Sequence, residues 1–179
     1  AQHAAQAPER FAATLDWALR LVVIVVLPAT LALVVLAGPL TVTIFHYGKF
    51  DEHDVRMSSL ALTAYASALL AFSIVKVLAP GYFARQDTRT PVRIGIRSLA
   101  VSMGLNLLVV LPLAFVYPGR PGLHALLALN TGIGAWYNST MLYRGLRRQG
   151  VLHHASGWRR MLWQVAAGNL LMVALLWWV

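Results

Sequence analysis

The chain alternates between long apolar runs and short polar segments, a pattern that predicts several membrane-spanning helices. A helix needs about 20 mainly apolar residues to cross the hydrocarbon core of a bilayer. Five runs reach that length, so the predicted fold class is an all-α integral membrane region. We expect the helices at residues 15–36 (with extension toward residue 45), 59–79, 91–116, 123–143 and 160–179.

Proline and glycine mark several of the expected helix ends. Pro80 and Gly81 predict the end of the second helix, because proline removes a backbone donor and glycine suits a C-terminal turn. Thr90 followed by Pro91 predicts an N-cap at the start of the third helix. Two further prolines fall inside apolar runs, where neighbouring groups can satisfy a freed carbonyl, so kinks are expected there.

Composition strengthens the membrane interpretation. Of the 179 residues, 59% are hydrophobic and 12% are charged, whereas soluble domains carry about 25% charged residues. The net charge of +9 would suggest nucleic acid in a soluble protein. Here the arginines lie in short gaps between apolar runs, which indicates membrane topology and no nucleic-acid binding. The chain has no cysteine, which excludes disulfides and thiolate metal sites.

The distribution of basic residues predicts an orientation. If five helices alternate across the membrane, the N-terminus, the 80–90 connection and the 144–160 connection share one side. Arginines concentrate on that side, with four at 85–97, five at 144–160 and two flanking the first helix. Only three basic residues lie on the other side. The positive-inside rule therefore places the N-terminus and both arginine-rich loops in the cytoplasm.

The connection between the second and third helices carries an acid among arginines. Asp87 lies between Arg85 and Arg89, and Arg93 follows in the next helix. One interpretation is a well-built turn in which Asp87 pairs with a neighbouring arginine; the other gives these residues a role in substrate binding or gating. Lys76 lies deeper, within the second helix, where an ionisable group either has a functional role or extends its stem to the headgroups.

Polar residues inside the other helices are further candidates. Asp16 and Arg20 stand four apart, a spacing that allows an ion pair on a helix. The pair acts either as a gate at the cytoplasmic mouth of a cavity or as an anchor at the membrane surface. Asn106, Asn130 and Asn138 lie in apolar runs, where amides usually form hydrogen bonds between helices.

Catalytic patterns are missing from the sequence. The six histidines have no metal-ligand spacing, and there is no glycine-rich phosphate loop and no Ser–His–Asp arrangement. We therefore expect no enzyme activity, no cofactor and no metal site.

Two segments closely resemble a known family. The stretch APGYFARQDTRTPVRIG resembles the segment APGFYARxDTxTPVKIG of the MurJ (MviN) family, with the two aromatics in the opposite order. The stretch LDWALRLVVIVVLPATLALVVLAGPLTVTIFHYGKF resembles DWxLRL…LPxxxxLxxLxxPLxxxLFxxGxF of the same family. A third stretch, YNSTMLYRGLRRQG, resembles the end of a later family helix.

The resemblance implies a fold and a role for this stretch of chain. Members of the family have fourteen helices, arranged as two six-helix lobes and two more helices. The five helices expected here would correspond to the ninth through thirteenth, so the chain is expected to be a partial piece. Some members bind sodium with an Asn and an Asp one turn later; Asn106 resembles that Asn, but Val110 stands at the second position, so no sodium site is expected.

The resemblance also implies a function. The family moves lipid II, the undecaprenyl-pyrophosphate-linked peptidoglycan precursor, across the bacterial inner membrane for cell-wall synthesis. The expected partners are lipid II, membrane lipids and the missing N-terminal lobe. Two alternatives stay open: another exporter of the MOP superfamily for polysaccharides or drugs, and a non-transporting membrane scaffold.

Overall fold

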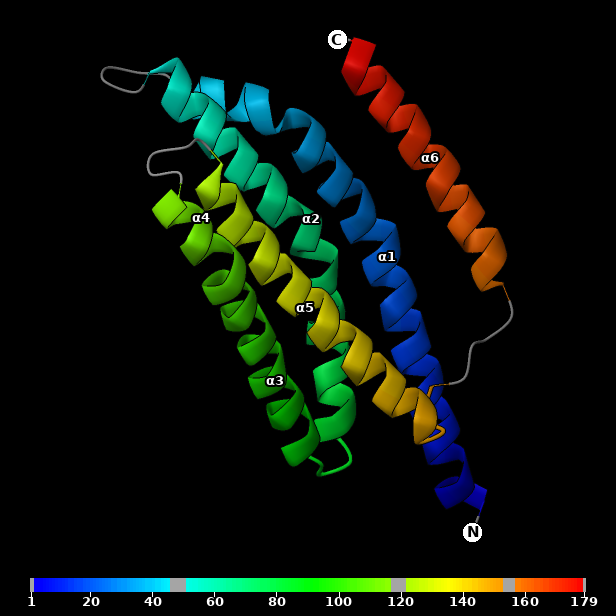
Figure 1. The fold of residues 1–179 in the computed structure, drawn as a ribbon. Coiled ribbons are helices and arrows are strands. Elements are labelled where there is room, and N and C mark those ends of the chain that lie inside the picture. Colours follow the sequence, from blue (N-terminus) through cyan, green and yellow to red (C-terminus); the bar gives the residue numbers. More distant parts are fainter. Residues whose placement is uncertain (1, 46–50, 117–121, 153–156, 179) are drawn as a thin grey trace.

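A computed structural model describes residues 2–45, 51–116, 122–152 and 157–178, and these residues form helices joined by turns (Figure 1). The helices, with one π-helical segment named η1, follow each other along the chain. They are α1 (Gln2–Phe45), α2 (Glu52–Phe83), α3 (Arg89–Leu105), η1 (Asn106–Val110), α4 (Leu111–Val116), α5 (Leu123–Arg148) and α6 (Trp158–Trp178).

The second and third helices differ from the sequence expectation at their shared corner. α2 continues through Pro80 to Phe83, because the amide of Ala84 donates to the carbonyl of Pro80 and closes one more turn. α3 begins at Arg89, ahead of the expected Thr90 cap, with Pro91 in its first turn. Proline is tolerated there because the first amides of a helix have no partner within the helix.

The prolines inside the apolar runs do not end their helices. α1 is a single helix of 44 residues that passes through Pro28. α3, η1 and α4 follow one another without a break from Arg89 to Val116. The π-helical turn Asn106–Val110 lies just before Pro112, where a wider turn relieves the clash between the proline ring and a carbonyl of the preceding turn.

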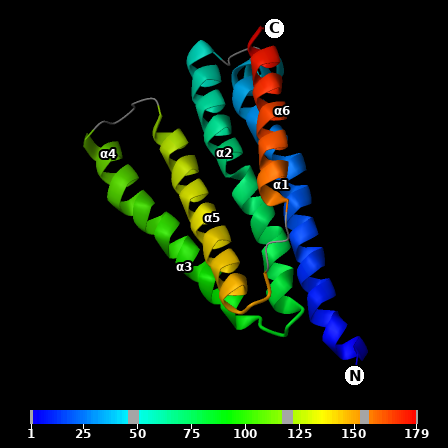
Figure 2. The same cartoon turned by 90° about the vertical axis from the view of Figure 1, so that its right-hand side faces the viewer.

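The chain connections place the basic segments at one end of the bundle. Figure 1 shows the N-terminal part of α1, the turn between α2 and α3, and the C-terminal end of α5 at the same end. We call this the basic end. α2 packs against α1 and α5, α3 packs mainly on α5, and α6 lies along α1. Figure 2 shows α3 and α4 leaning away from α2 toward the opposite end.

Small residues let α5 approach its two neighbours closely. A Cβ added at Gly132 would lie 3.1 Å from the Cβ of Ala68 in α2. On the other side, a Cβ added at Gly134 would lie 3.0 Å from the Cβ of Ser102 in α3, and the hydroxyl of Ser98 donates to the carbonyl of Gly134 at 2.7 Å. Such small-residue contacts are typical of helices packed in membranes.

Four helical stretches among the described residues are long and apolar enough to cross a membrane. They are Glu9–Phe45, Glu52–Phe83, Arg89–Val116 and Trp158–Trp178. α5 has 26 residues but is more polar than these four, because its packed faces use glycine, serine and asparagine. It runs antiparallel to the α3–α4 segment and lies between it and α2 (Figure 2).

Candidate functional site

A cluster of buried residues holds α1, α2 and α5 together at the basic end. Its members are Leu15, Leu19, Leu78, Tyr82, Leu142, Leu146 and Leu152. Tyr82 is fully buried, and its hydroxyl donates a 2.8 Å hydrogen bond to the carbonyl of Leu142 in α5. Gly145 faces the same hydroxyl so closely that a Cβ would collide with it. The tyrosine therefore joins α2 to α5 through a contact that requires glycine.

The turn after α2 is a Schellman motif that uses the carbonyls of Tyr82 and Phe83, the last two residues of α2. The amide of Asp87 donates to Tyr82, and the amide of Gln86 donates to Phe83. This pairing satisfies carbonyls that the helix end leaves free, and it needs a left-handed residue at the turn. Gln86 occupies that position with φ 59°, a conformation that costs a side-chain-bearing residue about 1–2 kcal/mol.

The end of α5 repeats this geometry beside the first turn. Gly150 has φ 67° and donates to the carbonyl of Arg147, while Val151 donates to Leu146. The two turns are joined by a 2.6 Å hydrogen bond from Nη1 of Arg85 to Oε1 of Gln149. Arg85 therefore joins two helix ends, beyond its expected contribution to topology.

Asp87 caps α3. Its Oδ1 accepts the amide of Thr90 at 3.0 Å, so Asp87, and not Thr90, satisfies the start of the helix. Hydrogen bonds from the side chain and the backbone of Thr90 hold the pKa of Asp87 below its usual value. Neither Arg85 nor Arg89 forms an ion pair with Asp87 in the described part of the chain. The expected ion pair between Asp87 and a neighbouring arginine is therefore wrong: the partner of the Asp87 carboxylate is the backbone amide of Thr90.

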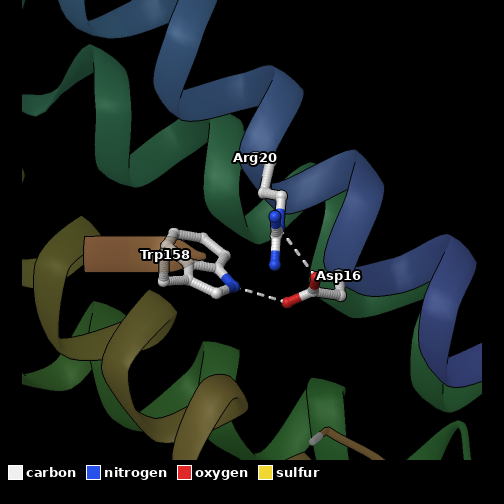
Figure 3. A network of polar contacts seen from close by, with 3 residues as sticks. All are labelled: Asp16, Arg20 and Trp158. Carbon is white, nitrogen blue, oxygen red and sulfur yellow. Dashed lines mark hydrogen bonds and ion pairs between the residues drawn. The ribbon is translucent and has the colours of Figure 1, made fainter. Parts of the chain in front are cut away.

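Asp16 and Arg20 form the ion pair that their spacing allows, and a third residue joins them (Figure 3). Nε of Arg20 lies 2.8 Å from Oδ2 of Asp16. The indole nitrogen of Trp158, at the start of α6, donates to Oδ1 of Asp16 at 2.6 Å, and the Arg20 guanidinium lies 5.4 Å from the centre of the indole ring. Asp16 is buried, so this network fixes the start of α6 on α1.

The remaining charged candidates are exposed and apart from this network. Lys76 lies on the outer face of α2, and Arg89 and Arg93 lie on α3. Arg97 continues their four-residue spacing, so three arginines follow one another along α3. The first turn of α3 contains no acid, and the one carboxylate at this end, that of Asp87, is engaged in capping the helix.

The structure brings two of the three candidate asparagines together. The side-chain amide of Asn130 in α5 donates to Oδ1 of Asn106 at 2.9 Å, at the start of the π-helical turn. Asn138 is separate, and its Oδ1 is buried without a hydrogen-bond partner among the described residues. No group of three His, Cys, Asp or Glu side chains suited to a metal occurs in the described ranges.

Sequence reasoning missed the residues that connect the helices. Aromatic residues near a helix end are typical of the membrane interface, yet Tyr82 is fully buried while Phe83 is half exposed. Trp158 is 142 residues from its partner Asp16 in the chain, so no local pattern reports the contact. Gly145 within a helix was the one available signal, since an interior glycine often marks a close approach.

These features define a multi-pass α-helical membrane protein with a positively charged end. The model of the family "Lipid II flippase MurJ" matches residues 1–179, and the chain belongs to this family. It is 40% identical over 168 residues to the lipid II flippase MurJ of Burkholderia cenocepacia. It is 44% identical over 171 residues to the protein of Vibrio cholerae named "Probable lipid II flippase MurJ". Family membership favours the flippase interpretation over another exporter or a scaffold, and it makes this a bacterial protein.

The matches cover nearly all of this chain and a minority of each relative. The alignments span 94% of the chain and 31% of the Burkholderia protein, and 93% of the chain and 30% of the Vibrio protein. The chain thus spans about a third of the length of these relatives.

Proposed function

We propose that this chain is part of a lipid II flippase, which moves the precursor from the cytoplasmic to the periplasmic leaflet of the bacterial inner membrane. The observation that carries the proposal is the family match across all 179 residues. Lipid II has a pyrophosphate-sugar head and a long isoprenoid tail. The head needs a polar, cationic route because charge in hydrocarbon is costly, whereas the tail can stay in lipid. This is transport without covalent chemistry.

We assign the exposed cations of α2 and α3 to the route of the pyrophosphate. Arg89 and Arg93 lie four residues apart along one side of α3, where an approaching anion relieves their mutual repulsion. Lys76 is exposed on α2 and forms no hydrogen bond or ion pair with the described residues. The first lobe of the full-length protein supplies the opposite wall, and the two lobes alternate in exposing the route to each side.

Asp16, Arg85 and Asp87 receive a different role within this proposal. Each is engaged in a contact between helices or helix ends, or in a helix cap, so we assign them to positioning the helices around the route. Asn106, Asn130 and Asn138 likewise hold or line the interior of the bundle. The basic end is placed in the cytoplasm, since the positive-inside rule favours that side for arginine-rich connections.

Complementation tests the function. The full-length protein that contains this chain should restore growth and lipid II export to a bacterium depleted of its own flippase. Arg93→Ala should reduce lipid II export by about tenfold, because a cation on the route is lost, and Arg93→Lys should retain more. Arg160→Ala, a matched charge loss at the start of α6, should export normally. Failure of the unaltered protein, or equal loss in both alanine variants, would contradict the proposal.

Cysteine labelling tests the orientation separately. Gln149→Cys lies in the connection between α5 and α6 at the basic end. In intact cells it should resist an impermeant thiol reagent and react after permeabilisation. Ready labelling in intact cells would reverse the proposed topology.

A further inference from the structure

The C-terminal end of α5 carries a cluster of three arginines that the transport route does not use. Arg144, Arg147 and Arg148 together line a surface pocket of about 430 Å³ at the basic end. All three side chains are exposed. Their spacing of three and four residues puts like charges on one side of the helix, which is unfavourable unless an anion lies between them.

No carboxylate of the chain neutralises this pocket. The chain has six acidic residues, and three of them, at 51–54, begin α2 at the opposite end of the bundle. Asp16 is engaged by Arg20 and Trp158, and Asp87 caps α3. The sixth acid, Glu9 in the N-terminal part of α1, forms no ion pair with these arginines. None of the three arginine side chains forms an ion pair or hydrogen bond with the described residues. The missing counter-charge must therefore come from outside the chain.

An apolar stripe leads from the pocket along the same side of α5. Trp136, Ile133 and Leu129 are 42%, 49% and 43% exposed, and with Arg144 and Arg147 they follow the three- and four-residue spacing of one helix face. The flanking faces of α5 are occupied by α2 and α3. Arg144 and Ile133 are separated by about 16 Å along the helix at 1.5 Å per residue, close to the thickness of one leaflet, about half of 30 Å.

We propose that this face of α5 binds an anionic phospholipid, with its phosphate in the arginine pocket and an acyl chain along the apolar stripe. Basic pockets on the cytoplasmic side of membrane helices favour anionic headgroups, and guanidinium groups bind phosphate through paired N–H donors. A soluble phosphate would use the arginines but not the stripe. The site is distinct from the route assigned to lipid II on α2 and α3, so it does not depend on the proposed function.

Trp136 provides a natural reporter for the test. The full-length protein is purified in a zwitterionic detergent and titrated with phosphatidylglycerol or phosphatidylcholine carrying dibrominated acyl chains, which quench nearby indoles. The signal of interest is the part of the quenching that disappears in Trp136→Phe. We expect phosphatidylglycerol to quench Trp136 at a concentration at least about tenfold lower than phosphatidylcholine does. Each arginine near an anionic headgroup increases the affinity by about fivefold, so two arginines already account for this difference.

Two variants with equal charge loss separate the pocket from general positive charge. In the double variant Arg147→Gln/Arg148→Gln, the concentrations of the two lipids that quench Trp136 should differ by no more than about threefold. Arg159→Gln/Arg160→Gln removes two charges from the start of α6, outside the pocket, and should keep the tenfold preference. Millimolar inorganic phosphate should leave the quenching in place, because it cannot occupy the apolar stripe.

Several results would overturn the proposal. Equal quenching by both lipids in the unaltered protein excludes a selective site, and this comparison needs no variant to fold. Quenching by neither lipid means that another part of the protein covers this face. Displacement by inorganic phosphate indicates a free-anion site, and displacement by an equimolar amount of lipid II indicates the transported substrate.

Discussion

Replacement of Gly145 by alanine should destabilise the protein, although alanine is the better helix former. An added Cβ would collide with the hydroxyl of Tyr82, whose ring is fully buried in the cluster at the basic end. The ring cannot move away freely, because its hydroxyl also donates to the carbonyl of Leu142. The change therefore forces either a shift of α5 from α2 or loss of this hydrogen bond.

The magnitude follows from three contributions. Overpacking of a tight interior costs about 1–3 kcal/mol, and loss of the hydrogen bond costs about 0.5–1.5 kcal/mol. Replacing glycine by alanine within a helix returns about 1 kcal/mol. Gly145→Ala should accordingly lower the free energy of unfolding by about 1–3 kcal/mol. Gly104→Ala is the matched control, because a Cβ there meets nothing within 4 Å, and it should be neutral or stabilising.

A double-mutant cycle measured by unfolding of the full-length protein in mixed detergent micelles tests the cause. Tyr82→Phe alone should cost about 1 kcal/mol, since it removes one hydrogen bond. In that background Gly145→Ala should cost about 1–2 kcal/mol less than in the unaltered protein, because the colliding atom is gone. The reasoning fails if Gly145→Ala is as stable as the unaltered protein, or if its cost is the same in both backgrounds.

Three further predictions concern the turns and the α1–α6 contact. Gln86→Gly should raise the free energy of unfolding by about 0.5–1 kcal/mol in the same assay, because glycine adopts the left-handed conformation without strain; a decrease would contradict this account. The lowered pKa of Asp87 means that its carboxylate contributes stability above its unfolded pKa of 3.8, and that this contribution is lost as pH falls through the folded pKa. The difference in the free energy of unfolding between the unaltered protein and Asp87→Asn should thus be constant at about pH 5–8 and disappear at acidic pH. A difference that persists at acidic pH would contradict the assignment of this effect to the Asp87 carboxylate. Trp158→Phe should lower the free energy of unfolding by about 1.5–3 kcal/mol, the range for hydrogen bonds to charged groups, whereas Trp163→Phe, on an exposed part of α6, should change it little.

The sequence was sufficient for features that depend on one helix at a time. Apolar runs of about 20 residues located the helices, since lipid leaves the backbone no other partner. The spacing of Asp16 and Arg20 indicated their ion pair, because residues four apart share a helix face. The segment 123–143 also reads as a helix, although its small and polar residues serve packing on two sides and lower its hydropathy.

The helix ends and the contacts between helices could not be derived in this way. The choice between Thr90 and Asp87 as the cap of α3 depends on the path of the turn, which Gln86 sets by adopting a positive φ. The burial of Tyr82 depends on α5, 60 residues further along the chain. An aromatic residue near a helix end in a membrane protein is equally typical of the interface, so its neighbours in the sequence do not distinguish the two positions.

The contacts at the basic end define the role of the corner between α2 and α3. The corner does not fix these two helices against each other, because α2 and α3 barely touch and diverge toward the opposite end (Figure 2). Each is joined to α5 instead: α2 through Tyr82 and the Arg85–Gln149 bond, α3 through Ser98 and Asn106. α5 is therefore the common support, and the corner sets where α3 starts. If the angle between α2 and α3 changes during transport, the separate contacts of these two helices with α5 have to accommodate the change. The π-helical turn that begins at Asn106 is the place where the α3–α4 segment already departs from regular α-helix.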